Sequence, residues 1–375
     1  MKIAIEAQRI FRRNKHGMDM VVLEAIRELQ RIDTKNEYYI YVSPGEDRCL
    51  HSSERVHIIE LKCPSYPLWE QVALPLAVRK LKPDILHCTS NTAPLFCNVP
   101  LVLTLHDIIF LEKRQHSSNS LYQEMGWHYR RWNVPRILSK CKRIITVSKY
   151  ECKRIREALH LPEKQIVPVY NGFSSRFKPL QETASITKKY IKNPSYLFFL
   201  GNTDPKKNVA RTLKAYSIYR AKSSQKLPLL IADFSEKALD IILKQENIEH
   251  IKPHLSFPGY ISHTDLPALY SGAFAFLYTS LRESFGIPML EAMASGTPVL
   301  AANTSAMPEV AGEEALLANP MDVEDIAKKL LELENNPTLY EAQVRYGLER
   351  VKQFSWEQTA RSMLSIYEQV YSSEQ

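Results

Sequence analysis

Two glutamates, Glu283 and Glu291, are the residues of this 375-residue chain whose spacing most clearly suggests chemistry. The continuously apolar run 274–278 precedes them and is typical of a parallel strand buried on both faces. Glu283 therefore follows the C-terminal end of a strand, which is where ligands bind to open α/β sheets. Glu291 falls in the first turn of a helix that we expect to begin at Pro288 and to end before Gly296.

The loop between these glutamates decides whether both carboxylates reach one pocket. On one continuous helix, eight residues turn through about 800°, which would leave the two side chains roughly 80° apart. A break before Pro288 removes that constraint, and Gly286 lets the backbone approach a ligand closely. Backbone N–H groups at the start of the helix would then favour a phosphate. The alternative is a solvated loop carboxylate beside a glutamate that stabilises the helix dipole, and the spacing alone leaves both interpretations open.

A second candidate site is basic. The segment 201–208 lies between a buried apolar run and a helical pattern, and it contains the adjacent lysines Lys206 and Lys207. These lysines would neutralise a diphosphate, while Gly201 would allow its close approach. The alternative is a solvated helix start, which is the more common setting for a bare Lys-Lys pair.

The first half of the chain offers two further positions. His106 and Asp107 follow the apolar run 101–105, so they would lie at the C-terminal end of a strand, although a neighbouring loop would satisfy a histidine there equally well. Gly17 opens a helical pattern after the first strand, where a Rossmann unit meets phosphate. No G-x-G-x-x-G occurs in the sequence, which disfavours an oxidoreductase.

Short apolar runs alternate with helical patterns along the chain, which favours βα units and parallel sheets. The runs form two series, one ending at residue 170 and one beginning at residue 196, and 375 residues exceed a usual single core. We therefore expect two doubly wound α/β domains, 1–180 and 181–354. An amphipathic helix over 355–375 completes the chain, with Ser355 as its N-cap.

The composition is that of a globular protein, with 45% hydrophobic residues. Six cysteines are scattered without a C-x2-C pair, so we expect reduced thiols in the cytoplasm rather than disulfides or a zinc site. Charged residues stand too early in the N-terminus for a signal peptide, and no apolar run approaches the length of a membrane span.

The net charge of +8 is concentrated in residues 111–156, which contain twelve Lys and Arg against three Asp and Glu. This surplus indicates an anionic partner at one surface, and we expect no nucleic acid as a partner. On a helix through this region, Trp127, Arg130 and Arg131 lie opposite a stripe that we expect to face the core. That stripe consists of Leu121, Tyr122, Met125, Tyr129 and Trp132.

The arginines around Trp127 resemble an interfacial anchor for an anionic membrane surface or a lipid-linked acceptor. The alternative is a solvated basic helix with Trp127 covered by a neighbouring loop, and both interpretations remain open.

The run 283–299, E-S-F-G-I-P-M-L-E-A-M-A-S-G-T-P-V, resembles the E-x7-E signature of the family 4 glycosyltransferases. The segments 201–208 and 257–262 are similar to the phosphate-binding and base-contacting segments of that family. The resemblance covers nearly the whole chain and is strongest over 196–320. It implies the GT-B fold, in which two Rossmann-like domains face each other across a cleft. The first domain would bind the acceptor, the second the nucleotide sugar, and the last helix would pack back on the first.

The resemblance also implies roles for individual residues. Glu283 would hold sugar hydroxyls, Glu291 the ribose and His106 the far side of the sugar. Lys206 and Lys207 would stabilise the leaving diphosphate. Lys206 stands where the family commonly has arginine, and 16–19 depart from its glycine-rich motif. The catalytic residues would be His106, Lys207 and Glu283, and the donor site would contain Gly17, Gly201, Lys206, Lys207, Ile261, Glu283, Ser284, Phe285, Gly286, Ile287 and Glu291.

A member of this family would be a retaining transferase that moves a hexosyl group from GDP-mannose or a UDP-sugar. The acceptor would be a glycan or lipid-linked glycan of cell-surface polysaccharide synthesis, met in the cytoplasm or at the inner face of the membrane. No D-x-D occurs in the sequence, so we expect no metal at the diphosphate and no other cofactor. Two alternatives remain, namely a sugar-nucleotide epimerase of the same architecture and a non-catalytic partner subunit.

Overall fold

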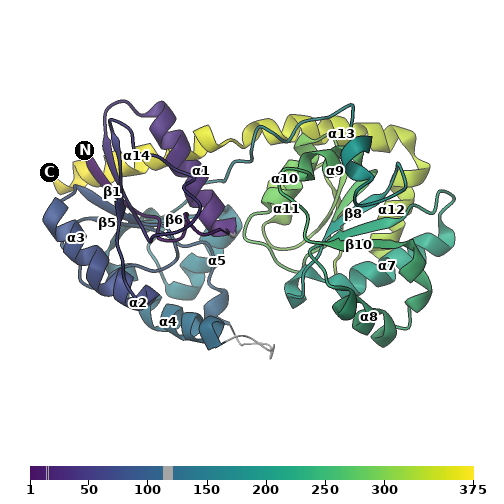
Figure 1. The fold of residues 1–375 in the computed structure, drawn as a ribbon, viewed down its shortest axis with the longest axis horizontal. Coiled ribbons are helices and arrows are strands. Elements are labelled where there is room, and N and C mark those ends of the chain that lie inside the picture. Colours follow the sequence, from purple (N-terminus) through teal and green to yellow (C-terminus); the bar gives the residue numbers. More distant parts are fainter. Residues whose placement is uncertain (14, 16, 113–120) are drawn as a thin grey trace. The chain divides into compact units, whose positions relative to one another are not determined.

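The computed structural model describes residues 1–13, 15, 17–112 and 121–375, and the side chains of 121–123 also lie outside this description. The chain divides into two compact units, each of which contains a parallel sheet (Figure 1). Unit 1 consists of residues 1–172 and 356–375, and unit 2 consists of residues 173–355. The predicted pair of doubly wound α/β sheets is confirmed.

In its described part, unit 1 contains a seven-stranded parallel sheet of order β3-β2-β1-β4-β5-β6-β7. The strands are β1 (Lys2–Glu6), β2 (Glu37–Val42), β3 (Val56–Glu60), β4 (Ile85–Cys88), β5 (Leu101–Thr104), β6 (Cys141–Thr146) and β7 (Ile166–Pro168). The helices, with η for a 3-10 or π segment, are α1 (Gly17–Ile32), α2 (Tyr66–Leu68), η1 (Trp69–Ala73), α3 (Leu74–Leu81), η2 (Ile109–Leu111), α4 (Leu121–Ile137), η3 (Leu138–Lys140), α5 (Lys149–Leu159), η4 (Glu163–Gln165) and α14 (Trp356–Glu374).

Both faces of this sheet are buried, as the apolar strands predict. Ile3 and Ile5 point into a core that α1 and α14 cover, whereas Ala4 between them points into a second core beneath α3, α4 and α5. Figure 1 shows α1 and α14 on one face, and α2, α3 and α4 on the other. This alternation is the period of two expected of a strand.

Unit 2 contains, in its described residues, a six-stranded parallel sheet of order β10-β9-β8-β11-β12-β13. The strands are β8 (Leu197–Leu200), β9 (Leu229–Ala232), β10 (Leu255–Gly259), β11 (Ala275–Tyr278), β12 (Val299–Ala302) and β13 (Leu316–Ala318). The helices are α6 (Ala184–Thr187), η5 (Pro205–Lys207), α7 (Val209–Lys222), α8 (Glu236–Gln245), η6 (Glu249–His254), α9 (Leu266–Gly272), α10 (Ile287–Ala294), α11 (Met307–Ala311), α12 (Val323–Asn335), α13 (Pro337–Arg350) and η7 (Val351–Gln353).

The division between the units falls at 172/173 rather than at the expected 180/181. Residues 173–180 belong with unit 2 because they are bonded to α9: the Phe177 ring packs edge-on against Tyr270, and the Leu180 N–H donates to Ser271 Oγ at 3.2 Å. A polar, strand-poor sequence gives no sign of such contacts. Among the described residues, no helix is long and apolar enough to cross a membrane.

Candidate active site

The loop between β11 and α10 holds the first predicted glutamate. The buried strand β11 ends at Tyr278, and Glu283 follows in the loop. Gly286 has φ of 110° and is the N-cap of α10, which begins one residue before the expected Pro288. A Cβ on Gly286 would lie 3.3 Å from Tyr278 Cε1 as well as in the left-handed region, so glycine is required here on two grounds. The loop therefore turns tightly against the end of the strand.

Lys207 and Glu283 form an ion pair at the centre of this site. Lys207 Nζ lies 2.6 Å from Glu283 Oε1, and the two side chains are only 17% and 13% exposed. The ammonium also stands 5.6 Å from the centroid of the Tyr278 ring. The structure thus brings together two of the predicted residues, 76 positions apart in the chain. A partly desolvated ammonium beside a carboxylate is suited to bind one anionic and one hydroxyl-bearing group.

Backbone and amide contacts hold the lysine loop against the glutamate loop. The Leu281 N–H donates to Lys206 O at 2.7 Å, and Asn208 Nδ2 donates to Thr279 O at 3.0 Å. Asn208 has φ of 59°, a conformation that asparagine tolerates better than most residues. Lys206 points elsewhere, because its Nζ lies 3.7 Å from Asp204 Oδ2 and its side chain is more exposed than that of Lys207. Lys207 is therefore the lysine that the fold positions.

Glu291 lies on α10 beyond the first turn, because the helix begins at Ile287. The expected position in the first turn is therefore wrong, and the alternative role of stabilising the helix dipole loses its basis. Burial raises the pKa of Glu291 to about 7, while Arg176 and the Tyr270 hydroxyl oppose that rise. The group is accordingly poised to change charge near neutral pH.

Tyr278 connects the two glutamates, and the sequence alone did not single it out. Burial raises the pKa of its hydroxyl, and Glu283 and Glu291 both raise it further. Both carboxylates thus act on the same hydroxyl. The Glu283 N–H donates to Ser305 Oγ at 3.0 Å, which fixes the loop from the other side. The sequence feature that could have identified Tyr278 is its position as an aromatic residue at the end of a buried strand.

The other predicted donor residues of unit 2 are mostly packed into its interior. Gly201 is closely surrounded, since a Cβ there would meet Ile231, Phe199 and Phe234 at 3.3 Å. Ile261 is buried, and Phe285 is buried with its ring against Phe354. Ser284 and Ile287 are partly exposed. Phe285 and Ile261 would therefore contribute shape or backbone groups rather than side-chain contacts.

His106 lies in unit 1 at the end of β5. Its Nε2 is 3.0 Å from Thr89 O, and because a carbonyl only accepts, Nε2 carries the proton and Nδ1 is an acceptor. Burial lowers the pKa of His106, so the imidazole is neutral at pH 7. The His106 N–H donates to Asn91 Oδ1 at 2.7 Å, which orients the backbone.

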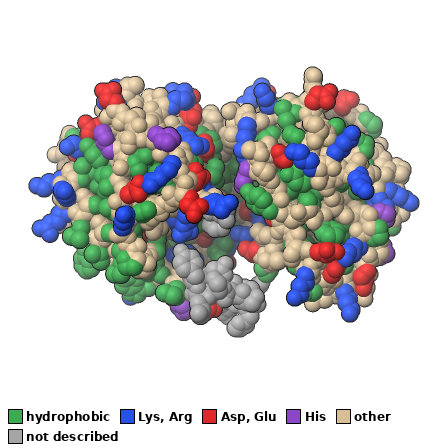
Figure 2. Space-filling model, viewed as in Figure 1, with side chains coloured by type: hydrophobic (Ala, Val, Ile, Leu, Met, Phe, Trp, Pro, Cys, Tyr) green, Lys and Arg blue, Asp and Glu red, His purple; other side chains and the backbone are tan. Residues whose placement is uncertain are grey.

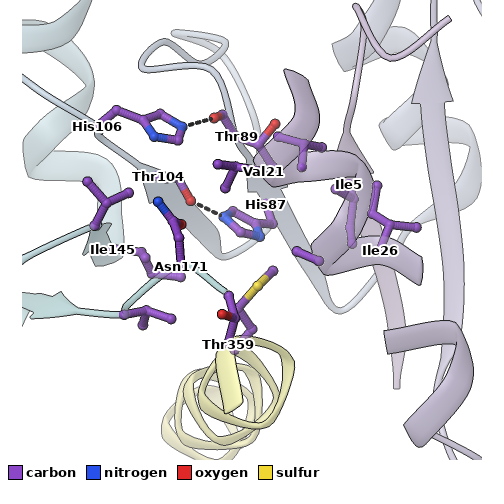
Figure 3. A pocket seen from close by; sticks show the side chains of 15 residues that line it. Ile5, Val21, Ile26, His87, Thr89, Thr104, His106, Ile145, Asn171 and Thr359 are labelled. Carbon is purple, nitrogen blue, oxygen red and sulfur yellow. Dashed lines mark hydrogen bonds between the residues drawn. The ribbon is translucent and has the colours of Figure 1, made fainter. Parts of the chain in front are cut away.

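A second histidine, His87, was not predicted. It lines a small pocket of unit 1 together with His106 (Figure 3). Its Nε2 is 2.8 Å from Thr104 Oγ1 and its Nδ1 is 2.7 Å from Tyr367 OH on α14. Burial lowers the pKa of His87 to about 3, so it stays neutral. The pocket has a volume of about 30 Å³, which is too small for a sugar. His87 therefore joins β4 to α14 within unit 1, and Gly17 at the start of α1 remains exposed.

The predicted orientation of the helix over 121–137 is wrong. Met125 is exposed, and Trp127 is partly buried against the core beneath α4. Arg131 lies over the Trp127 ring at 4.6 Å and donates to Phe110 O at 3.2 Å, so this pair is engaged within the protein. Arg130 is partly exposed. The predicted stripe also included Leu121 and Tyr122, whose side chains lie outside the described residues, and Trp132, which is exposed. Of its described members, Tyr129 does face the interior, where its hydroxyl donates to the buried Glu70.

Polar anchoring explains this rotation. The face that α4 buries contains Asn133, Val134 and Ile137, and Asn133 Nδ2 donates to Ala93 O at 2.9 Å. Trp127 and Val134 are seven residues apart, or within about 20° on the helix, so they share this face. A prediction from hydrophobic residues alone cannot place an asparagine on the buried face, because its burial depends on hydrogen bonds rather than on hydrophobicity.

Both halves of the chain are similar to known proteins. Residues 182–350 match the family described as glycosyl transferases group 1, and residues 16–176 match glycosyltransferase family 4. O-antigen chain mannosyltransferase B of Escherichia coli is 30% identical over 71% of this chain and 69% of its own length. The serotype-specific mannosyltransferase WbdA of Escherichia coli is 26% identical over 81% of this chain, which spans only 39% of WbdA.

Solved structures show the same fold. Sucrose-phosphate synthase of Thermosynechococcus elongatus covers 100% of both chains with a TM-score of 0.77 at 19% identity. Anabaena HepE, solved in complex with UDP-glucose, covers 98% of this chain and 100% of its own with a TM-score of 0.72 at 17% identity. The fold is therefore GT-B, and the chain belongs to the family 4 glycosyltransferases.

Proposed function

We propose that the protein is a retaining, metal-independent glycosyltransferase that moves a hexosyl group from a nucleoside diphosphate sugar to a glycan or lipid-linked glycan. Unit 2 binds the donor and unit 1 binds the acceptor. The observation on which this rests is the Lys207–Glu283 pair, in which a cation and a carboxylate are held together at the end of a buried strand. These are the groups that a diphosphate and a sugar require side by side.

The chemistry follows from the charges that develop as the glycosidic bond breaks. The leaving diphosphate gains negative charge, which Lys207 and backbone N–H groups at the start of α10 stabilise. When the donor binds, a phosphate oxygen competes with Glu283 for the Lys207 ammonium, and this frees carboxylate oxygens of Glu283 to accept from sugar hydroxyls. Glu291 accepts from the ribose. Lys206 adds charge from a more exposed position.

His106 completes the proposed set from unit 1. Its Nδ1 accepts from a hydroxyl on the far side of the sugar, because Nε2–H is already committed to Thr89 O. In this scheme the leaving phosphate takes the proton of the acceptor hydroxyl, so no side chain acts as a general base. The absence of D-x-D from the sequence supports an arrangement in which lysine replaces a metal at the diphosphate.

GDP-mannose is the donor that the relatives support best, because two of those compared are named mannosyltransferases. A UDP-sugar is the second candidate, and HepE bound to UDP-glucose supports it. The named O-antigen transferase supports an acceptor in cell-surface polysaccharide synthesis. Six cysteines without a disulfide among them support a reducing compartment, the cytoplasm.

A thermal-shift screen of nucleotide sugars tests the donor assignment. A ligand at 100 times its Kd adds about 2.7 kcal/mol to the free energy of unfolding, so the true donor raises Tm by several degrees. Lys207→Ala should abolish that rise, whereas Lys328→Ala, a lysine on an exposed helix face, should keep it. If no GDP- or UDP-sugar raises the Tm of the wild type, the proposal is wrong. An epimerase would instead convert the donor without any acceptor.

A further inference from the structure

Unit 1 exposes a group of large hydrophobic side chains that the proposed reaction does not use. Six of them, each 43–81% exposed, define what we call the apolar surface. Ten exposed large hydrophobic side chains occur in the described residues, so this surface holds more than half. Figure 2 shows hydrophobic side chains gathered over this edge of unit 1, where α2, α3 and α4 lie in Figure 1. The six residues are Leu68, Val72, Leu76, Phe96, Met125 and Trp132.

Hydrogen bonds join the three segments that carry these side chains. Gln71 Nε2, on η1, donates to Tyr129 OH on α4 at 2.7 Å, and the Leu95 N–H donates to Gln71 Oε1 at 2.9 Å. The Tyr129 and Trp132 rings lie 6.0 Å apart. These hydrogen bonds hold the three segments that carry the apolar side chains beside one another.

A π-turn aligns the first three side chains. On an uninterrupted α-helix, Leu68 and Leu76 would lie about 80° apart. The π-helix η1 lies between them, and its wider turn takes up part of that angle. Trp69, Leu74 and Val78 fill the core on the opposite face. The segment thus presents a row of aliphatic side chains outward.

A buried carboxylate keeps this surface rigid. Glu70 accepts from Tyr66 OH at 2.7 Å and from Thr92 Oγ1 at 2.5 Å, and it also accepts from Tyr129 OH. These donors come from α2, from the segment after β4 and from α4. A carboxylate satisfied by several donors fixes the elements around it, so the exposed side chains project from a fixed base.

Basic side chains surround the apolar surface. Arg136 lies over the Trp132 ring at 5.4 Å and donates to Trp132 O, and Lys140 lies over the Phe96 ring at 5.2 Å and donates to Leu95 O, so both cations are held at the edge of the apolar side chains. The last turn of α3 adds Arg79 and Lys80, both exposed. The only acidic residue of α4 is Glu124. Aromatic and aliphatic side chains edged by cations are the arrangement of a surface that enters the headgroup region of an anionic bilayer.

We propose that the apolar surface binds an anionic membrane, with its side chains among the lipid headgroups and the basic side chains on their phosphates. A second copy of the chain fits less well, because a two-fold contact would set this surface and its cations against themselves. The proposal does not rest on the proposed transfer reaction, because membrane binding needs neither donor nor acceptor. It replaces Trp127, which packs partly buried against the core beneath α4, by Trp132, which is exposed.

Vesicle co-sedimentation of the whole chain tests the proposal. The wild type should pellet with vesicles containing phosphatidylglycerol, less with pure phosphatidylcholine, and less again at high salt. Replacing Leu76, Phe96 and Trp132 together by serine should weaken binding by about tenfold or more. The pair Arg136→Gln and Lys140→Gln should weaken it about 25-fold, from about 1 kcal/mol for each cation.

The matched control replaces Ile241 and Met321, which are 50% and 58% exposed in unit 2, by serine. This control should bind vesicles as the wild type does, and circular dichroism should show every variant folded. The proposal is wrong if the wild type does not bind anionic vesicles, or if both surface variants bind as tightly as the control. It is equally wrong if the wild type is a dimer that the serine variant dissolves while neither binds vesicles.

Discussion

Replacing Glu291 by glutamine should make protein stability less dependent on pH. Burial raises the pKa of Glu291 from 4.5 to about 7, so the folded state binds its proton more tightly than the unfolded state. The carboxyl group therefore favours folding fully below about pH 4.5, and this contribution is lost as the pH rises to about 7. The full rise corresponds to about 3 kcal/mol. Because the side chain is partly exposed, we expect about 2 kcal/mol, or about 4–8 °C in Tm for a unit of this size.

The assay compares the Tm of the wild type and Glu291→Gln at pH 5 and pH 8, without ligand. Near pH 5 the two should differ little, and at pH 8 the glutamine variant should be the more stable. Glu324→Gln, at an exposed carboxylate, is the control and should show the same difference from the wild type at both values. An unchanged difference between the wild type and Glu291→Gln across this range would refute the reasoning that burial holds the carboxyl group neutral.

Three further predictions concern the same site. Glu283→Ala and Lys207→Ala should each reduce turnover by about 10²–10³, the usual cost of one preorganised electrostatic contact, and near-normal transfer by a folded variant would exclude that role. Gly286→Ala should lower the urea midpoint by an amount equal to about 1–3 kcal/mol, because of its φ of 110° and the nearby Tyr278, whereas Gly17→Ala, with no atom within 4 Å of the added Cβ, should not. Transfer should survive EDTA, and a loss that Mg²⁺ or Mn²⁺ restores would contradict the metal-free proposal.

The sequence predicted the fold because its signals were local. The apolar run ending at Tyr278 predicts a buried strand without any information from distant residues. Gly286 indicates the turn that separates Glu283 from α10. The family resemblance added the expectation that Lys207 and the glutamate loop belong to one donor site, but not that Lys207 and Glu283 form an ion pair. Spacing alone would not have joined residues 76 positions apart.

The partners that adjust the site were not predictable in the same way. Arg176 acts on Glu291 from 115 residues away in the chain, and Ser305 fixes the Glu283 loop from beyond β12. Such contacts depend on how elements pack. For the helix α4 a prediction was possible but wrong, because its hydrophobic pattern indicated a different buried face from the one that the structure shows. Hydrogen bonds of Asn133 and Tyr129 decided its orientation and left Trp132 outside.

The most direct test of the central claim is the anomeric configuration of the product. The purified protein would be incubated with GDP-mannose or an α-linked UDP-sugar, a glycan acceptor and EDTA, and the new linkage would be read from its one-bond C–H coupling by NMR. We predict an α-linked product with one nucleoside diphosphate released for each sugar transferred, and no product from Lys207→Ala. A β-linked product would contradict retention, and conversion of the donor without any acceptor would contradict the transferase assignment itself.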